Sequence, residues 1–376
     1  MIRPTFAEVD GDAIAHNVAF VAGVVAPSMV CAVVKADGYG HGAELVARAA
    51  LQGGAPWLAV ALIEEAVRLR DAGIDAPILL LSECPPAAMR QARDLDVRMT
   101  LYSPEGIAAA AAAAVTAAAP QPWPVHLKVD TGMHRVGTSP DHVVARARAI
   151  VEAEGLDFEG LWTHCAVADD LDNPFTTTQL DRFEAAVAAL DAAGYHPSML
   201  HAGNSAVALW HPRGRYDMVR LGISMYGYPP AAQHRLIGRA LQPALRLVSQ
   251  VVHVQVVAAG EGVSYGHRWR ADTATTVATV PIGYEDGVRR DLGLRGGSVL
   301  IGGRRHRIIG VITMDQLMVE CVDDSVAVGD EVVLIGAQGD ETITADEIAD
   351  RLGTISYEVL CNVGARVPRH DVRGSS

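Results

Sequence analysis

Hydrophobic residues in roughly the first 225 positions gather into short β-branched runs, separated by longer stretches with helical spacing. The runs predict eight strands, near Val30–Val34, Trp57–Ala61, Ile78–Leu81, Arg98–Leu101, Val125–Val129, Phe158–Thr163, Met199–His201 and Met218–Ile223. Apolar residues three or four positions apart predict helices that begin at Ala43 and extend over Glu64–Asp71, Pro104–Ala119, Pro140–Glu154 and Pro174–Ala193. Eight strand–helix alternations favour a (β/α)8 barrel. Periodicity leaves a doubly wound open sheet as an alternative, although the first turn lacks G-x-G-x-x-G.

The pattern changes after Pro229–Ala232, because from about Leu241 strands follow one another with turn residues between them. We expect these strands at Leu245–Ala258, Thr275–Pro281, Ser298–Ile301, His306–Ile309, Leu317–Cys321 and Glu331–Ile335. A single helical stretch, Ala345–Leu352, interrupts them. The sequence therefore predicts an α/β barrel over residues 1–240, followed by a mainly-β domain over residues 241–376. Thr5–Val9 alternates like a strand, so residues 1–10 are expected to pair with the second domain.

Composition narrows the class of partner and the compartment. The formal net charge of −13 argues against nucleic acid or an anionic membrane as a partner. The five cysteines are scattered and form no C-x-x-C pair, which fits a reducing compartment. The amino terminus lacks a signal-peptide core, and the longest apolar stretch, Ile107–Ala119, is mostly alanine and stops at Pro120. We expect a cytoplasmic protein without a membrane segment.

Lys35 is the first candidate for chemistry. It stands where a buried strand gives way to a turn with three glycines. Partial desolvation lowers the pKa of such an amine and makes it a nucleophile for a carbonyl, including the aldehyde of pyridoxal phosphate. An ordinary surface lysine after a strand is the alternative. Other polar residues at predicted strand ends are Lys128, His164, His201 and Arg220, and the carboxyl ends of barrel strands are where active sites form.

The string Val33–Gly42 closely resembles the cofactor-lysine signature of alanine racemases. Further segments similar to that family follow in the same order through both predicted domains: Lys128–Arg135, Thr163–Ala166, Asn204–Ser205, Val219–Ile223, Ser264–Gly266, Pro281–Tyr284, Met314–Gln316 and Tyr357–Cys361. The resemblance implies a fold-type III pyridoxal-phosphate enzyme, an isomerase that interconverts L-alanine and D-alanine. It also implies a homodimer with the active site at its interface, which either supplies D-alanine for peptidoglycan or degrades it.

The resemblance assigns two acid–base groups to opposite faces of the substrate Cα: Lys35, which also binds the cofactor aldehyde, and Tyr265 from the other subunit. A phenol with a pKa near 10 is a poor base at neutral pH, so nearby positive charge must favour its phenolate. We expect His164, next to Arg220, to supply that charge. Arg220 is expected against the pyridine nitrogen, where its permanent proton keeps the ring a weaker electron sink than an aspartate partner would. That weakness suits racemisation and suppresses transamination.

The remaining roles also come from the resemblance. The cofactor-binding residues it implies are Lys35, Tyr39, Asn204, Ser205, Arg220, Gly222, Ile223 and Tyr357. Arg135 is expected to bind the substrate carboxylate with the Met314 amide of the partner chain. Lys128 matches a lysine that the family often carries as a carbamate, an anion able to orient Arg135. The entrance positions are Asp169, Tyr284 and Arg290. No metal site is expected.

Three alternatives differ from this reading in class. A non-catalytic pyridoxal-phosphate carrier would resemble the barrel half alone, and a decarboxylase of the same fold would favour an acidic partner for the pyridine nitrogen. A metal-dependent barrel hydrolase would need metal-ligand motifs such as H-E-x-x-H, which the fourteen histidines do not form. The chain departs from the commonest racemase pattern at Cys165, His134 and Glu285, and none of these changes removes a functional group. Preference for alanine over serine rests on the resemblance.

Overall fold

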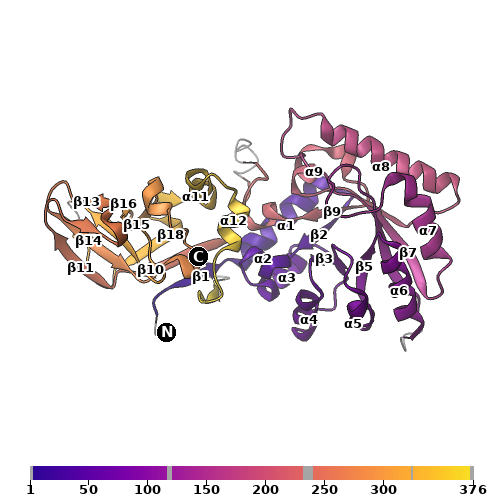
Figure 1. The fold of residues 1–376 in the computed structure, drawn as a ribbon, viewed down its shortest axis with the longest axis horizontal. Helices are drawn as coiled ribbons and strands as arrows, with labels where there is room; N and C mark the ends of the chain where they lie inside the picture. Colours follow the sequence, from indigo (N-terminus) through magenta and orange to yellow (C-terminus); the bar gives the residue numbers. More distant parts are fainter. Residues whose placement is uncertain (1–2, 117–120, 232–239, 323–324, 373–376) are drawn as a thin grey trace. The chain divides into compact units, whose positions relative to one another are not determined.

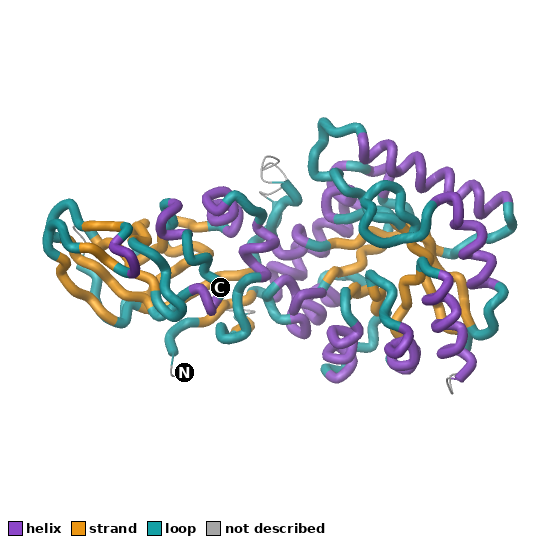
Figure 2. Tube along the Cα trace, in the orientation of Figure 1, coloured by secondary structure: helices purple, strands orange, loops and turns teal. Residues whose placement is uncertain are grey.

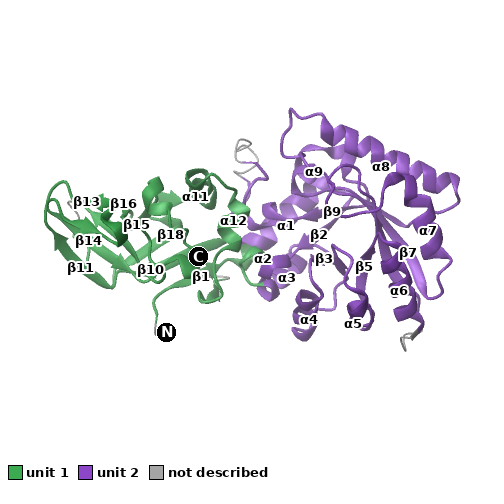
Figure 3. Ribbon diagram, in the orientation of Figure 1, with its two compact units in different colours: residues 1–12, 39–42, 243–376 green, residues 13–38, 43–242 purple. Residues whose placement is uncertain are grey.

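The computed structural model describes residues 3–116, 121–231, 240–322 and 325–372. It divides into two compact units, coloured separately in Figure 3. Unit 1 comprises residues 1–12, 39–42 and 243–376, and unit 2 comprises residues 13–38 and 43–242. Helices and strands alternate in unit 2, whereas unit 1 is built mostly of strands (Figure 2).

Eight parallel strands, several of them labelled in Figure 1, form the sheet of unit 2. Their order is β8-β7-β6-β5-β4-β3-β2-β9. Their bounds are β2 Met29–Val33, β3 Trp57–Val60, β4 Ile78–Leu80, β5 Val97–Leu101, β6 Trp123–Lys128, β7 Leu156–Trp162, β8 Met199–His201 and β9 Met218–Leu221. Backbone hydrogen bonds from Asp217 N to Leu200 O (3.0 Å) and from Arg220 N to Gly203 O (2.8 Å) connect the segments of β8 and β9. The sheet is therefore a nearly closed barrel, which confirms that prediction over the doubly wound alternative.

All eight predicted barrel strands are present, with ends shifted by at most two residues. Strands β3 and β4 are buried along their whole length, as expected for parallel strands with a filled barrel interior on one side and helices on the other. The helices are α1 Gly11–Val25, α3 Ala43–Gln52, α4 Ile63–Asp71, α5 Met89–Asp94, α6 Pro104–Thr116, α7 Val143–Val151, α8 Phe175–Ala192 and α9 Ser205–Trp210. The sequence did not predict α1, α5 and α9. The end of the predicted helix Pro104–Ala119, beyond Thr116, lies outside the described residues.

Unit 1 contains a ten-stranded sheet in the order β11-β14-β17-β16-β15-β18-β10-β1-β20, with β19 paired to β18. Its strands are β1 Phe6–Val9, β10 Leu245–Gln250, β11 His253–Val257, β14 Thr275–Val280, β15 Ser298–Ile301, β16 Arg304–Ile309, β17 Leu317–Cys321, β18 Glu331–Gln338, β19 Glu341–Ile343 and β20 Arg369–Asp371. A separate short hairpin joins β12 Gly262–Val263 to β13 Trp269–Arg270. The amino-terminal strand β1 pairs antiparallel with β10 and parallel with β20.

One prediction in this region is wrong. The run Leu245–Ala258 is not a single strand, because β10 pairs with β1 and β18 whereas β11 pairs with β14. The predicted helix is present as α11 Ala345–Leu352, and a second helix, α12 Ser356–Cys361, follows it. Among the described residues, no helix combines the length and apolar character needed to cross a bilayer. None of the five cysteines forms a disulfide.

Candidate active site

The carboxyl end of the barrel gathers basic side chains from several strands. Lys35 follows β2, Lys128 ends β6, and Arg220 is the penultimate residue of β9. His164 follows β7, and its pKa lies well below the usual value because of burial and then because of Arg220, Lys128, Arg135 and Lys35, in that order. Four basic side chains therefore act on one imidazole. Such a convergence of positive charge favours an anionic ligand.

The two lysines differ in their acid–base chemistry from the other basic residues. Lys35 and Lys128 are the only lysines in the chain, and the remaining permanently basic side chains are all arginines. Arginine stays protonated at biological pH, whereas a lysine amine can lose its proton when it is desolvated. Both lysine amines thus lie at the same end of the barrel. The presence of only two lysines in the sequence already points to these residues, and the sequence analysis did not use that count.

Arg220 is nearly fully buried, with 3% of its surface exposed. It donates from Nη1 to His201 Nδ1 (2.8 Å) and from Nη2 to Thr163 O (2.8 Å) and His164 Nδ1 (3.2 Å). Its guanidinium also lies over the Trp162 ring, 4.5 Å from the centroid. Burial lowers the pKa of Arg220 to about 10, so the side chain is still charged at neutral pH.

Because a guanidinium has donors only, the hydrogen bonds of Arg220 fix the tautomers of both histidines. Nδ1 accepts in each ring, and the neutral ring must then carry its proton on Nε2. His201 Nε2 donates to His126 Nδ1 (2.9 Å), and His126 Nε2 donates to Glu159 Oε2 (2.9 Å). A chain of donors thus runs from Arg220 through two fully buried imidazoles to a carboxylate. Sequence reasoning missed His126 and Glu159, although His126 lies two positions before Lys128 on the same strand.

The structure changes the expected role of His164. Its lowered pKa means that the ring is neutral at neutral pH, so it does not supply the positive charge that the sequence analysis assigned to it. With Nδ1 accepting from Arg220, its Nε2–H is a hydrogen-bond donor. The His164 carbonyl accepts from Nε2 of the buried Gln179 (3.0 Å), which holds the loop after β7 in place.

Lys128 has 2% of its surface exposed, and its amine lies 4.4 Å from the centroid of the Trp162 ring. Burial, followed by the charges of Arg220 and Arg135, lowers the pKa of Lys128 from 10.5 to about 7. A large fraction of this amine is therefore neutral at neutral pH. Arg135 is exposed, and its side chain makes no hydrogen bond within the described residues.

Lys35 opens the segment α2 Lys35–Tyr39, which the sequence predicted only as a glycine-rich loop. It is a left-handed turn, with φ and ψ of 53° and 48° at Ala36, 52° and 49° at Asp37, and 61° and 44° at Gly38. Left-handed helical geometry costs roughly 1–2 kcal/mol for each non-glycine residue. Backbone strain of this kind persists where surrounding contacts hold it, often at functional sites.

Four of the expected cofactor-binding residues lie after β8 and β9. Asn204 caps α9 by accepting from Val207 N (3.0 Å), and Ser205 Oγ accepts from Gly222 N (2.9 Å). The Gly222 amide is thus already used within the barrel, and the Ser205 hydroxyl hydrogen is left to donate. Ile223 opens the short 3₁₀ segment η4 Ile223–Tyr226. Asp169 lies exposed in the loop after His164.

The other predicted site residues belong to unit 1. Tyr265 opens the 3₁₀ segment η5 Tyr265–His267 and is 71% exposed. The residue before it, Ser264, has a left-handed backbone with a φ of 63°. Met314 is half exposed, and its carbonyl accepts from Glu285 N (3.2 Å), which places it beside the exposed Tyr284. Within this unit the rings of Tyr39 and Tyr357 lie 6.0 Å apart, and Arg290 is exposed.

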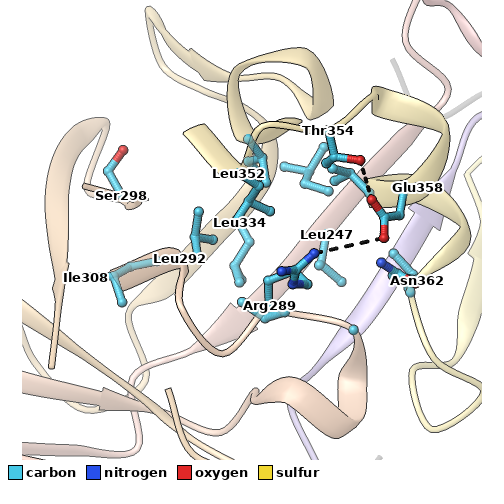
Figure 4. Close-up of a pocket in the computed structure, with 16 residues that line it drawn as sticks. Leu247, Arg289, Leu292, Ser298, Ile308, Leu334, Leu352, Thr354, Glu358 and Asn362 are labelled. Carbon is cyan, nitrogen blue, oxygen red and sulfur yellow. Dashed lines mark hydrogen bonds and ion pairs between the residues drawn. The ribbon is translucent and has the colours of Figure 1, made fainter. Parts of the chain in front are cut away.

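Unit 1 also has a pocket with about 540 Å³ of empty volume, shown in Figure 4. Its walls are mostly apolar and include Leu247, Leu334 and Leu352. Arg289 and Glu358 form an ion pair at one side of it, with a separation of 3.9 Å. It contains none of the predicted site residues. Among the described residues, no group of three or more histidine, cysteine or acidic side chains could hold a metal ion.

Comparison with known proteins adds an independent result. The family described as "Alanine racemase, N-terminal domain" matches residues 9–230, and "Alanine racemase, C-terminal domain" matches residues 244–371. The alanine racemase of Symbiobacterium thermophilum is 45% identical over 369 residues, which cover 98% of this chain and 97% of that protein. Alanine racemase 1 of Bacillus subtilis is 42% identical over 370 residues, which cover 98% of this chain and 92% of the relative.

Solved structures give the same result. The crystal structure of alanine racemase from E. faecalis superposes with a TM-score of 0.92 at 40% identity and covers 98% of both chains. The Bacillus anthracis enzyme, crystallised with bound L-Ala-P, superposes with a TM-score of 0.93 at 37% identity, covering 100% of this chain and 97% of that one. The similarity therefore extends over both units.

Proposed function

The chain belongs to the alanine racemase family, and from that premise we propose that it interconverts L-alanine and D-alanine by a two-base mechanism with pyridoxal 5'-phosphate. The observation that carries the proposal is the convergence of Lys35, Lys128, Arg135 and Arg220 on His164. This group provides a nucleophilic amine and an excess of positive charge for a substrate carboxylate and a cofactor phosphate.

The residues present fit that cofactor. Lys35 would hold its aldehyde, and Arg220, which stays charged at neutral pH, would face the pyridine nitrogen without giving up a proton. Ser205 retains a hydroxyl hydrogen for the phosphate, and the other phosphate donors we assign are Tyr39, the Ile223 amide and Tyr357. Asn204 and Gly222, whose amide already donates to Ser205, complete the proposed cofactor-binding residues. When bound, the cofactor supplies an electron-withdrawing ring that acidifies the Cα proton of an amino acid attached to it.

Two acid–base groups move the Cα proton in this proposal. Lys35 serves one face, and Tyr265 of the partner subunit serves the other. The Nε2–H of neutral His164 would donate to the Tyr265 phenolate, while the compensating charge resides on Arg220 behind the ring. This arrangement favours the phenolate without placing a second full charge beside it.

Arg135 is proposed to bind the substrate carboxylate, together with the Met314 amide of the partner subunit. We propose that Lys128 carries a carbamate, because its pKa of about 7 leaves the neutral amine that addition of CO2 requires. The addition forms an N–C bond and releases one proton, which turns a cation beside Arg135 into an anion that can hold it. Asp169, Tyr284 and Arg290 are proposed to line the entrance.

We further propose a homodimer whose sites each use both subunits. The exposure of Tyr265 and Met314 in the single chain supports it, since both are assigned to a site completed by a partner. The absence of disulfides among five cysteines supports a cytoplasmic location. The reaction either supplies D-alanine for peptidoglycan or degrades it.

Replacement of Lys35 tests the proposal directly. A Lys35→Ala variant should lose the visible absorbance of the lysine-bound cofactor, and the interconversion of alanine enantiomers should fall by a factor of roughly 100 to 10,000 or more. Chiral chromatography of alanine and of serine, followed over time, measures the second effect and the substrate preference. Wild-type racemisation by Lys35→Ala would overturn the assignment.

A further inference from the structure

The left-handed turn after Lys35 needs contacts that hold it in place. Its first residue, Ala36, has φ 53° and ψ 48° and is the immediate neighbour of Lys35. Gly38 N donates to Val34 O (2.9 Å), which closes the turn. The Asp37 carboxylate accepts from Ala43 N (3.0 Å) and fastens the turn to the start of α3. The direction in which Lys35 leaves the backbone depends on this local geometry.

Glu65 supplies a further contact, on the residue next to Lys35. It lies in the first turn of α4, which follows β3, the barrel strand paired with β2. Glu65 Oε1 accepts from Ala36 N at 2.6 Å. Glu65 Oε2 accepts from Ala61 N (2.8 Å) and Leu62 N (3.1 Å), at the start of its own helix. Hydrogen bonds to a charged acceptor are shorter and stronger than those between neutral groups.

The two carboxylate oxygens of Glu65 therefore have separate tasks. Oε2 caps the helix, as an acidic residue at this position commonly does. Oε1 reaches to the neighbouring strand's turn, and helix capping does not require that contact. Glu64, one position earlier, is exposed and makes no side-chain hydrogen bond or ion pair within the described residues. It shares the place of Glu65 at the helix start without the contact to Ala36.

We propose that Glu65 is a positioning residue for Lys35, fixing through the Ala36 amide the direction from which the lysine amine meets a carbonyl. The inference rests on the proposed function in one respect, namely that Lys35 is the cofactor lysine. Attachment forms a bond between Nζ of Lys35 and the aldehyde carbon of pyridoxal phosphate and releases one water. Its rate depends on the approach of the amine, so loss of the Glu65 contact slows attachment.

The test compares Glu65→Ala, Glu65→Gln and the control Glu64→Ala in the full-length protein. Cofactor is stripped, pyridoxal phosphate is added back, and attachment is followed by visible absorbance. Borohydride fixation and peptide mapping locate the adduct, which is simple because the chain has two lysines. We expect Glu65→Ala to attach the cofactor about tenfold to a hundredfold more slowly, because small misplacements of a reacting group have effects of this size. Glu64→Ala should match the wild type.

Glu65→Gln separates positioning from capping. Its single amide oxygen can accept from Ala36 or from the helix start, but not from both, so its rate should lie between those of the wild type and Glu65→Ala. Hydrogen exchange of the peptide over residues 29–42 should accelerate in the same order. Should Glu65→Ala fail to fold by circular dichroism, the Glu65→Gln rate decides the question against Glu64→Ala.

A purely structural role gives a different result. Loss of the cap alone would lower the melting temperature of Glu65→Ala and leave its attachment rate, measured well below that temperature, equal to that of Glu64→Ala. That outcome overturns the inference and leaves the proposed function intact. If the wild type itself attaches no cofactor at Lys35, the proposed function fails instead.

Discussion

Arg220 determines which of its neighbours can give or take a proton. It has no acceptor atom, so Nδ1 of His164 and Nδ1 of His201 must both accept from it. Burial and the surrounding cations keep His164 neutral. The group offered to a proposed Tyr265 phenolate is thus an N–H donor backed by a guanidinium. The positive charge therefore lies on Arg220, behind His164, and not on His164 itself, where the sequence analysis expected it.

Replacing Tyr265 by phenylalanine removes one of the two proposed bases and leaves the other. Exchange of the Cα proton should fall by roughly 100-fold for one enantiomer and much less for the other, because each base serves one face. Deuterium incorporation from heavy water into each enantiomer separately, read by NMR, measures the two rates. Equal, small losses in both directions would contradict the two-base scheme.

Lys128 gives a prediction about pH. Its folded pKa, about 7, lies below the usual 10.5, so the ammonium prevails below pH 7 and the neutral amine above it. Since carbamate forms from the neutral amine with loss of a proton, its occupancy should rise as the pH increases through about 7. After incubation with ¹³C-bicarbonate, a carbamate ¹³C signal should follow that course in the wild type. The signal should be missing from Lys128→Met, and a wild type without it refutes the modification.

At the scale of elements, all eight barrel strands could be predicted because most of their residues are buried, and their apolar runs are conspicuous. The run Leu245–Ala258 misled the prediction because β10 and β11 are both β-rich, and the break between Gln250 and His253 follows from their different pairing partners. Helix α1 escaped because its alanines and valines surround the whole helix instead of forming one stripe. Strand pairing and alanine-rich packing are tertiary effects that a local pattern does not contain.

The site residues also fall into two groups, those that the sequence indicates and those that only the structure shows. Residues carried by motifs, such as Lys35 and Arg220, were found from the chain. Glu65, His126 and Glu159 were not, because their importance lies in contacts made across neighbouring barrel strands. The left-handed conformation at Ala36 and Asp37 could not be predicted either, because alanine disfavours it and aspartate adopts it mostly as a single residue. The surrounding contacts impose it on both residues in succession.

A series of hydrogen bonds runs from Arg220 through His201 and His126 to Glu159 and links β9, β8, β6 and β7. We therefore expect it to contribute to the stability of the barrel. A His126→Phe variant leaves the buried Nε2–H of His201 without its acceptor. We expect a loss of about 1–3 kcal/mol in the free energy of unfolding, the penalty for one unsatisfied buried polar group. Urea denaturation measures it, with His196→Phe as the control on the exposed surface. An unchanged urea midpoint in His126→Phe would show that these hydrogen bonds contribute nothing to the free energy of unfolding.

At the scale of the whole molecule, the two units carry complementary parts of the proposed chemistry. Unit 2 holds Lys35, His164 and Arg220, and unit 1 holds Tyr265 and Met314. Family similarity covers residues in both units, which separates this chain from a cofactor carrier built on the barrel alone. Assembly into a symmetric dimer would give two equivalent sites, each with Lys35 from one subunit and Tyr265 from the other.

Mixing two inactive variants tests that division of labour. In a hybrid of a Lys35→Ala subunit and a Tyr265→Phe subunit, one site carries both substitutions, and the other has an intact Lys35 and an intact Tyr265. Random reassociation of equal amounts makes half of the dimers hybrids, so about a quarter of the wild-type activity should return, although each parent alone is nearly inactive. Unfolding and refolding the two variants together, with separately refolded samples as the control, provides the measurement. If both bases belonged to one subunit, no mixture would exceed the activity of its parents, and the interface assignment of Tyr265 would have to be abandoned.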